Sequence, residues 1–325
     1  MLNIVFAGSP AIAAILLKGL IELKQVGIAA VLTNAPSPAG RSKMPVSTPV
    51  AQLALESGLA VLEPEKLDAS VREKIAALKP DLLVCFAYGK IFGPKFLALF
   101  PKGGINLHPS LLPKYRGPTP VPAAILAGET KTGITVQRLA QRMDSGDILA
   151  QKEIAMDGTE TAEEVLTHAA HEGVPLVSDV LAQIESGTER AVVQNEEEAS
   201  YCKVFCKADG FLDWTKSAAS LCAQVRAFQP WPGTFTCAGN TKLYIHTASV
   251  YRGACTFGEA AAGTVIGIDK DCGILVQTGD GVLAIQKLQK EAKKAMQWKD
   301  FLNGSRNFIG TQCSSSAFSN VPSAQ

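Results

Sequence analysis

Residues 103–117 read Gly-Gly-Ile-Asn-Leu-His-Pro-Ser-Leu-Leu-Pro-Lys-Tyr-Arg-Gly, and this stretch decides how the chain is interpreted. A short apolar run ends in Asn106 and His108, and Pro109 stops it. Residues i and i+2 of a strand point to the same face of a sheet. The spacing therefore predicts an amide and an imidazole side by side at a strand end, where they could stabilise an oxyanion and handle protons.

The residues around this stretch alternate buried-strand and helix patterns. Strands are predicted at 2–7, 27–33, 81–87 and 104–107, and helices at 11–23, 49–57 and 69–78. Fully apolar strands that alternate with helices indicate a parallel-rich sheet covered on both faces, a Rossmann-like α/β fold. The Gly-x-Gly-x-x-Gly fingerprint of dinucleotide binders is missing, because residues 7–12 read Ala-Gly-Ser-Pro-Ala-Ile.

A carboxylate follows further along the chain. Residues 141–147 read Gln-Arg-Met-Asp-Ser-Gly-Asp and lie between predicted strands at 133–139 and 148–154. Asp144 could orient the imidazole and favour its charged form, and Asp147 competes for the same role. A long amphipathic helix is predicted after them, at 161–184.

The pattern changes in the last third of the chain. Short β-like runs are predicted at 234–237, 243–251, 263–269, 273–278 and 281–288. Short strands separated by Gly, Asn and Asp indicate a small barrel, and we expect an OB-like one. The predicted organisation is a catalytic domain at 1–189, a linker at 190–207, the barrel at 208–313 and a disordered Ser-rich tail at 314–325.

Charge is distributed unevenly between the two halves. The chain of 325 residues has a net charge of +1, so as a whole it does not indicate a nucleic-acid partner. Residues 1–202 hold 18 basic and 22 acidic residues, whereas residues 203–325 hold 13 and 8. Such an asymmetry is typical of a second domain that binds a polyanion, although a modest excess also arises by chance.

The apolar N-terminal run is interrupted at residues 8–10, Gly-Ser-Pro, and has no basic segment before it. We therefore expect a buried strand there rather than a signal peptide, and a cytoplasmic protein without a membrane span. The eight cysteines are then expected to be reduced. No Cys-x-x-Cys pair occurs, and no metal is expected.

The two polar stretches together carry a family resemblance. Asn-x-His-Pro-Ser-Leu-Leu-Pro-x-Tyr-x-Gly, followed by Met-Asp-Ser-Gly-Asp, resembles the folate-dependent formyltransferases, which move a formyl group from 10-formyltetrahydrofolate to an amine. The resemblance implies that Asn106 and protonated His108 stabilise an oxyanion. It also selects Asp144, the first Asp of the second motif, as the partner of His108.

The same resemblance implies the folate contacts. They are Phe86, Ala87, Tyr88, Gly89 and Ile91, after the third strand, and Ser110, Leu111, Leu112 and Pro113, within the first motif. The carboxyl ends of parallel strands are where α/β sheets bind ligands, which agrees with the first group. A cis Leu112–Pro113 bond would suit a tight functional turn.

Three further segments resemble the family members that formylate methionyl-initiator tRNA. A Pro/Gly-rich loop at 38–45 carries Arg41 and Lys43, and residues 226–233 read Arg-Ala-Phe-Gln-Pro-Trp-Pro-Gly. Residues 289–296 would form a helix face that is either solvated or, opposite a polyanion, contacts phosphates through Lys287, Lys290, Lys293 and Lys294. The resemblance thus implies initiator tRNA as partner of a monomeric enzyme.

Three alternatives remain at this point: a formyltransferase acting on glycinamide ribonucleotide, a formyltetrahydrofolate hydrolase, and an RNA-binding module on an inactive sheet domain. The first would normally end after its catalytic domain, whereas this chain adds a basic barrel, and the second attacks with water and has no use for one. The complete amide, imidazole and carboxylate set argues against the third.

Overall fold

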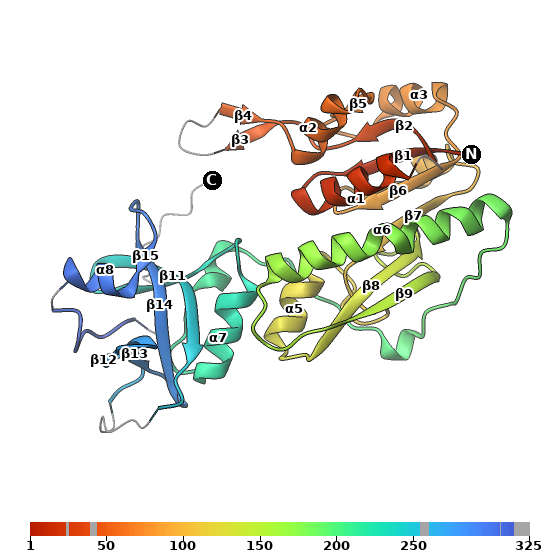
Figure 1. Cartoon of the computed structure of the whole chain (residues 1–325). Coiled ribbons are helices and arrows are strands. Elements are labelled where there is room, and N and C mark those ends of the chain that lie inside the picture. Colours follow the sequence, from red (N-terminus) through yellow and green to blue (C-terminus); the bar gives the residue numbers. More distant parts are fainter. Residues whose placement is uncertain (24–25, 40–43, 254–259, 306, 315–325) are drawn as a thin grey trace. The chain divides into compact units, whose positions relative to one another are not determined.

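The structure is a computed structural model, and it describes residues 1–23, 26–39, 44–253, 260–305 and 307–314. The chain forms two compact units (Figure 1). Unit 1 comprises Met1–Val121, Thr130–Met156 and Glu164–Lys203, and unit 2 comprises Pro122–Glu129, Asp157–Glu163 and Val204–Gln325. Arg41 and Lys43, and the predicted tail from residue 315, lie outside the described residues.

Unit 1 contains a seven-stranded sheet with the order β5-β2-β1-β6-β7-β8-β9. Its strands are β1 (Leu2–Gly8), β2 (Val26–Leu32), β5 (Val61–Leu62), β6 (Leu82–Phe86), β7 (Gly104–His108), β8 (Lys131–Arg138) and β9 (Ile148–Ala155). The first five in the sheet order are parallel, and β8 and β9 pair antiparallel. The predicted Rossmann-like, parallel-rich sheet is confirmed.

Helices cover both faces of this sheet. Ile4 and Phe6 of β1 pack in one core with α1 (Ala11–Glu22), α2 (Pro49–Glu56) and α6 (Ala162–Ser186), and Figure 1 shows α1 and α6 along that face. Val5 and Ala7 pack in a second core with α3 (Ala69–Ala77) and α4 (Pro94–Leu97). Alternate residues of a strand point to opposite faces, so a strand that is apolar throughout supplies both cores.

The strand order fixes the position of the polar motif. Strands β2 and β5 lie on one side of β1, and β6 and β7 lie on the other, so the winding of the sheet reverses between β1 and β6. Since β6 and β7 run parallel, their carboxyl ends at Phe86 and His108 lie at the same edge of the sheet. This is the edge at which open α/β sheets bind ligands.

Unit 2 contains an antiparallel sheet of six strands with the order β10-β11-β14-β13-β12, and β15 pairs with β14. The strands are β10 (Thr234–Ala238), β11 (Thr241–Val250), β12 (Val265–Asp269), β13 (Gly273–Gln277), β14 (Val282–Lys290) and β15 (Met296–Gln297). Helices α7 (Ala218–Ala227) and α8 (Trp298–Asn303) belong to the same unit, whose core includes the fully buried Trp214. The five predicted strands are present. In the part of the chain that the structure describes, their ladder is open, with β10 and β12 at its ends.

The lysine-rich segment at 287–296 is not a helix, so this prediction was wrong. Lys287 and Lys290 belong to β14, and the chain then turns through Ala292, which has a φ of 61°. The turn lets Met296 pair with Leu288. Cross-strand pairing and the buried side of β14 outweigh the helical preference of the Lys- and Ala-rich run.

The remaining elements are short. Strands β3 (Ser37–Ala39) and β4 (Met44–Val46) pair antiparallel on either side of residues 40–43. Helix α5 (Pro120–Leu126) follows the first polar motif, and two 3-10 turns follow α6: η1 (Glu196–Glu198) and η2 (Lys207–Gly210). No helix within the described residues is both long enough and apolar enough to span a membrane.

Candidate active site

Asn106 and His108 lie at the C-terminal end of β7, on the same face of the sheet. Ile105 and Leu107, which alternate with them, belong to the core on the opposite face. Asn106 pairs with Gln137 across the β7–β8 ladder, and His108 pairs with Thr135. The Asn106 side chain is partly exposed, and within the described chain its amide makes no hydrogen bond. An amide donor is therefore available beside the imidazole.

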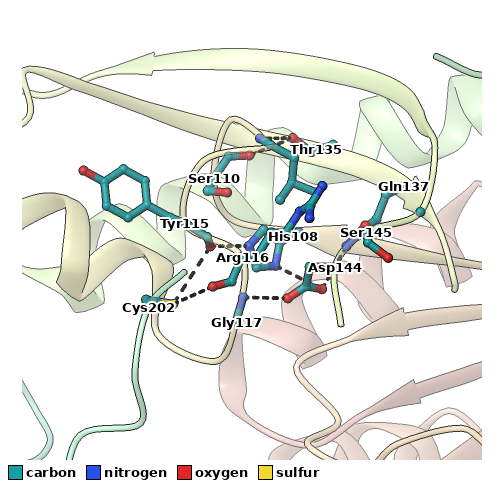
Figure 2. Close-up of polar contacts among 12 residues, drawn as sticks. His108, Ser110, Tyr115, Arg116, Gly117, Thr135, Gln137, Asp144, Ser145 and Cys202 are labelled. Carbon is teal, nitrogen blue, oxygen red and sulfur yellow. Dashed lines mark hydrogen bonds and ion pairs between the residues drawn. The ribbon is translucent and has the colours of Figure 1, made fainter. Parts of the chain in front are cut away.

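The His108 ring is held between two partners (Figure 2). Its Nε2 lies 2.9 Å from the Tyr115 carbonyl oxygen, and its Nδ1 lies 3.7 Å from Asp144 Oδ1. A carbonyl oxygen only accepts, so the first contact assigns a proton to Nε2 and leaves Nδ1 facing the carboxylate. The ring is 4% exposed, and this burial lowers its pKa. The Asp144 charge and the Tyr115 carbonyl act in the opposite direction.

Asp144 is the carboxylate that faces His108. Its Oδ2 accepts from the Gly117 N–H at 2.8 Å, and its Oδ1 accepts from Gln137 Nε2 at 2.9 Å (Figure 2). The structure thus brings together Asn106, His108 and Asp144 at the carboxyl end of β7. Gln137 was not predicted as a site residue, because a polar residue within a strand does not indicate which residues lie opposite it in the neighbouring strand.

Both loops around the imidazole adopt left-handed backbone conformations. Tyr115 has a φ of 58°, Asp144 a φ of 52° and Gly117 a φ of 112°. For residues with a side chain this conformation costs about 1–3 kcal/mol and persists only where surrounding contacts enforce it. At Gly117 a Cβ atom would lie 2.7 Å from the Cys202 carbonyl oxygen, so glycine is required there.

In the loop after β6, mainly backbone groups and a few exposed residues are accessible to a ligand. The side chains of Phe86 and Tyr88 are 1% exposed and belong to the two cores. Ala87, Gly89 and Ile91 are exposed, and Ile91 reaches 79%. Ala87 and Gly89 have φ values of 51° and 81°, which turn this loop sharply at the edge of the sheet.

The second predicted folate segment is fixed by hydrogen bonds to β8 and β9. Thr135 Oγ1 donates to the Ser110 carbonyl at 2.7 Å and accepts from the Leu112 N–H at 3.2 Å. Gln151 Nε2 donates to the Leu112 carbonyl, and Ser110 Oγ donates to the Lys114 carbonyl. Leu111 and Pro113 are partly exposed, and the Leu112–Pro113 bond is cis. These bonds hold the segment in one shape beside His108.

The lysines of unit 2 that are predicted to contact phosphates differ in their exposure and in the contacts that they already make. Lys287, Lys293 and Lys294 are exposed. Lys290 Nζ instead donates to Ser305 Oγ at 2.7 Å and lies 5.0 Å from the centre of the Phe301 ring. Among the residues that the structure describes, no cluster of three or more His, Cys, Asp or Glu side chains is arranged to hold a metal ion.

Comparisons with known proteins cover most of the chain, in both units. The formyl transferase family pattern matches residues 1–181, and the formyl transferase C-terminal domain matches residues 206–306. A methionyl-tRNA formyltransferase of Treponema denticola is 48% identical over 95% of this chain and 98% of its own length. One of Borrelia hermsii is 37% identical over 95% of this chain and 99% of its own.

Solved structures with lower identity share the fold. HypX from Aquifex aeolicus in complex with tetrahydrofolic acid superimposes with a TM-score of 0.65 at 16% identity, over 95% of this chain and 48% of HypX. WlaRD, a sugar 3N-formyl transferase, gives a TM-score of 0.64 at 20% identity, over 90% of this chain and 99% of its own. With both domains matched and relatives this similar along nearly their full length, the chain belongs to the formyl transferase family, in the group of the methionyl-tRNA formyltransferases.

Proposed function

We propose that this protein transfers the formyl group of 10-formyltetrahydrofolate to the α-amine of methionyl-initiator tRNA, giving N-formylmethionyl-tRNA for translation initiation. The observation that carries the proposal is the meeting of Asn106, His108 and Asp144 at one strand end, in a chain 48% identical to a methionyl-tRNA formyltransferase. The reaction is a direct acyl transfer from one nitrogen to another.

The roles of the three side chains follow from their positions. The α-amine attacks the formyl carbon, and the formyl oxygen gains negative charge. The free amide of Asn106 donates to that oxygen, an interaction that is stronger in the transition state than in the ground state. His108, which is buried, takes up the proton that the attacking amine loses.

Asp144 stabilises the resulting imidazolium. Once Nδ1 carries a proton, both nitrogens of His108 face an acceptor: the Tyr115 carbonyl and Asp144 Oδ1. The charged ring adds to the stabilisation of the oxyanion. His108 then returns the proton to the folate nitrogen as the carbon–nitrogen bond to the folate breaks, so the proton balance closes.

The folate would bind along the edge formed by two loops. The exposed Ala87, Gly89 and Ile91, with the backbone of Phe86 and Tyr88, would line one side. Ser110, Leu111, Leu112 and Pro113 would line the other. The fit is supported by the rigid hydrogen bonding of the second loop and by HypX, a protein of the same fold that binds tetrahydrofolic acid.

Unit 2 would bind the tRNA as an OB-like barrel. Two isolated bridges, Ala238 with Cys313 and Thr264 with Gln312, join the ends of the open ladder through one C-terminal segment, which supports closure. We further propose that Arg41 and Lys43 meet the acceptor stem, and that the protein is a cytoplasmic monomer. The division at 1–189, 190–207 and 208–313, with a disordered tail from 314, stays a prediction.

The direct test is a formylation assay with labelled 10-formyltetrahydrofolate. Charged methionyl-initiator tRNA, glycinamide ribonucleotide and water alone are compared as acceptors. Label recovered in N-formylmethionyl-tRNA supports the proposal. Formylation of the ribonucleotide, or release of formate without an acceptor, would replace it with one of the two alternatives.

Binding of tRNA should weaken steeply as salt rises, because each neutralised phosphate releases counterions. Replacing Lys287 or Lys293 by alanine should lower the slope of log K against log salt by about one. Lys290→Ala should change it less, because its Nζ already donates to Ser305. Filter binding at several salt concentrations measures these slopes, with exposed Lys18 of unit 1, replaced by alanine, as control. A flat response of the unmodified protein would contradict tRNA binding.

Asp144→Asn should lower the pKa of His108, because the lost carboxylate no longer favours the imidazolium. The fold should persist, since asparagine has nearly the same shape. NMR titration of the His108 ring in both proteins measures the shift, and Asp147→Asn serves as the matched control. An unchanged or raised pKa in Asp144→Asn would exclude Asp144 as the electrostatic partner.

A further inference from the structure

The loops that carry Tyr115 and Asp144 are joined by a chain segment outside both motifs, residues 192–202. At its start, Val192 exchanges backbone hydrogen bonds with Ile148, the first residue of β9. Near its end, the Arg116 N–H donates to the Ser200 carbonyl and the Cys202 N–H donates to the Arg116 carbonyl, each at 2.8 Å. The segment therefore follows the site from the Asp144 side to the Tyr115 side.

Gln194 bridges the two loops with its side chain. Its Nε2 donates to the carbonyls of Asp144 and Gly146, at 2.9 and 2.7 Å. Its Oε1 accepts from Arg116 Nε and Nη2, at 3.0 and 2.9 Å. The residue is 5% exposed, so the contacts replace water at both ends of the amide.

Arg116, the other half of the bridge, is a fully buried cation. Its Nη2 lies 2.8 Å from Glu196 Oε1, and its Nη1 lies 2.9 Å from the Tyr201 hydroxyl. Arg142, two residues before Asp144, reaches the same hydroxyl at 3.2 Å. A buried charge needs such partners, and it fixes the elements that supply them.

The bridge acts where His108 is held. The two polar partners of the imidazole come from Tyr115 and Asp144, and both residues adopt left-handed conformations that surrounding contacts must enforce. Gln194 bonds the Asp144 backbone directly. Arg116 is the next residue after Tyr115. The contact between Gln194 and Arg116 therefore helps to fix the distance between the two partners of His108, together with the bond from the Gly117 N–H to Asp144 Oδ2.

We propose that Gln194 and Arg116 are positioning residues for formyl transfer, which hold the Tyr115 carbonyl and the Asp144 carboxylate on the two sides of His108. The inference rests on the proposed function for its rate effects. Its structural part concerns His108 alone and can be measured without any substrate.

The test compares Gln194→Leu with Glu189→Gln. The leucine removes the four hydrogen bonds of the bridge and also the longer one, 3.5 Å, from Gln194 Nε2 to Gln137 Oε1. Glu189 forms a 2.8 Å ion pair with Arg138 in the same unit, without contacting either loop, so its variant is the matched control. Three quantities are measured for each protein: thermal unfolding, the pKa of His108 by NMR, and kcat and KM for formyl transfer.

Gln194→Leu should lower the pKa of His108, because the Asp144 loop loses its backbone anchor and the carboxylate, held only by Gly117 and Gln137, moves away from the ring. It should lower kcat about tenfold or more, since small displacements of catalytic groups have effects of this size. KM should change less than about twofold. Glu189→Gln should leave the His108 pKa and kcat as in the unmodified protein. If Gln194→Leu folds and its His108 pKa equals that of the unmodified protein, the inference is overturned. This holds even if no formyl transfer is detected in either protein.

Gln194→Glu covers the case in which Gln194→Leu does not fold. A carboxylate keeps the acceptor for Arg116, and even strengthens that contact, but it cannot donate to the carbonyls of Asp144 and Gly146. A folded Gln194→Glu protein with kcat lowered about tenfold supports positioning through the Asp144 loop. The same protein with unmodified kcat would show that Gln194 serves stability only.

Discussion

His108→Ala is expected to lower kcat for formyl transfer by roughly 10²–10⁴, the usual contribution of a positioned acid–base group. The imidazole acts on the proton and charge that develop during the reaction, so the affinity for folate should change little. The ring lies between two acceptors, the Tyr115 carbonyl and Asp144, and alanine at this position has no group that could carry the proton. Single-turnover rates and folate binding are measured separately.

His168→Ala is the control for this variant. His168 is exposed on α6 and should keep the unmodified rate. Thermal unfolding of His108→Ala shows whether the small cavity at the strand end disturbs the sheet. If the folded variant retained more than about a tenth of the rate, His108 would not be the acid–base group.

Asn106→Ala is expected to lower the rate by about 10²–10³, the loss that follows removal of one oxyanion donor. Its amide is partly exposed and makes no hydrogen bond within the described residues, so the substitution should hardly change stability. The effect should lie in kcat rather than KM, because the developing oxyanion is bonded more strongly than the formyl oxygen of the substrate.

Asn303→Ala provides the comparison for this amide. Asn303 is exposed in α8 of unit 2, and removal of its amide should leave kcat unchanged. Formylation kinetics and thermal unfolding of both variants are compared with those of the unmodified protein. An Asn106→Ala rate within about threefold of the unmodified rate would remove Asn106 from the oxyanion site.

The elements and the core of the site could be predicted because they depend on local pattern. The apolar run at 2–7 supplies both cores of its sheet, and the i+2 spacing of Asn106 and His108 puts them on one face of β7. The sequence motif also favoured Asp144 over Asp147 as the partner of His108, and the structure places Asp144 3.7 Å from the ring. Periodicity and motif spacing can be read from the order of the residues alone.

The lysine segment shows where local pattern fails. Lys287 and Lys290 lie in a run with good helix formers, yet they belong to β14 because its apolar side packs in the core of unit 2. The expected barrel is a similar case. Whether the ladder of β10–β14 closes depends on how residues near 312 meet two strands far away in the sequence.

The sequence by itself determined the strand–helix alternation, the amide–imidazole pair and the family, since these follow from residue periods and from a motif of adjacent residues. Only the tertiary structure decided that Arg116 is fully buried and that Gln194, 78 residues away, ties it to the Asp144 loop. The physical reason is that a hydrogen bond between distant segments has no period along the chain. It exists only once the sheet has brought both loops to one edge, where burial makes an unpaired charge or amide too costly to leave without a partner.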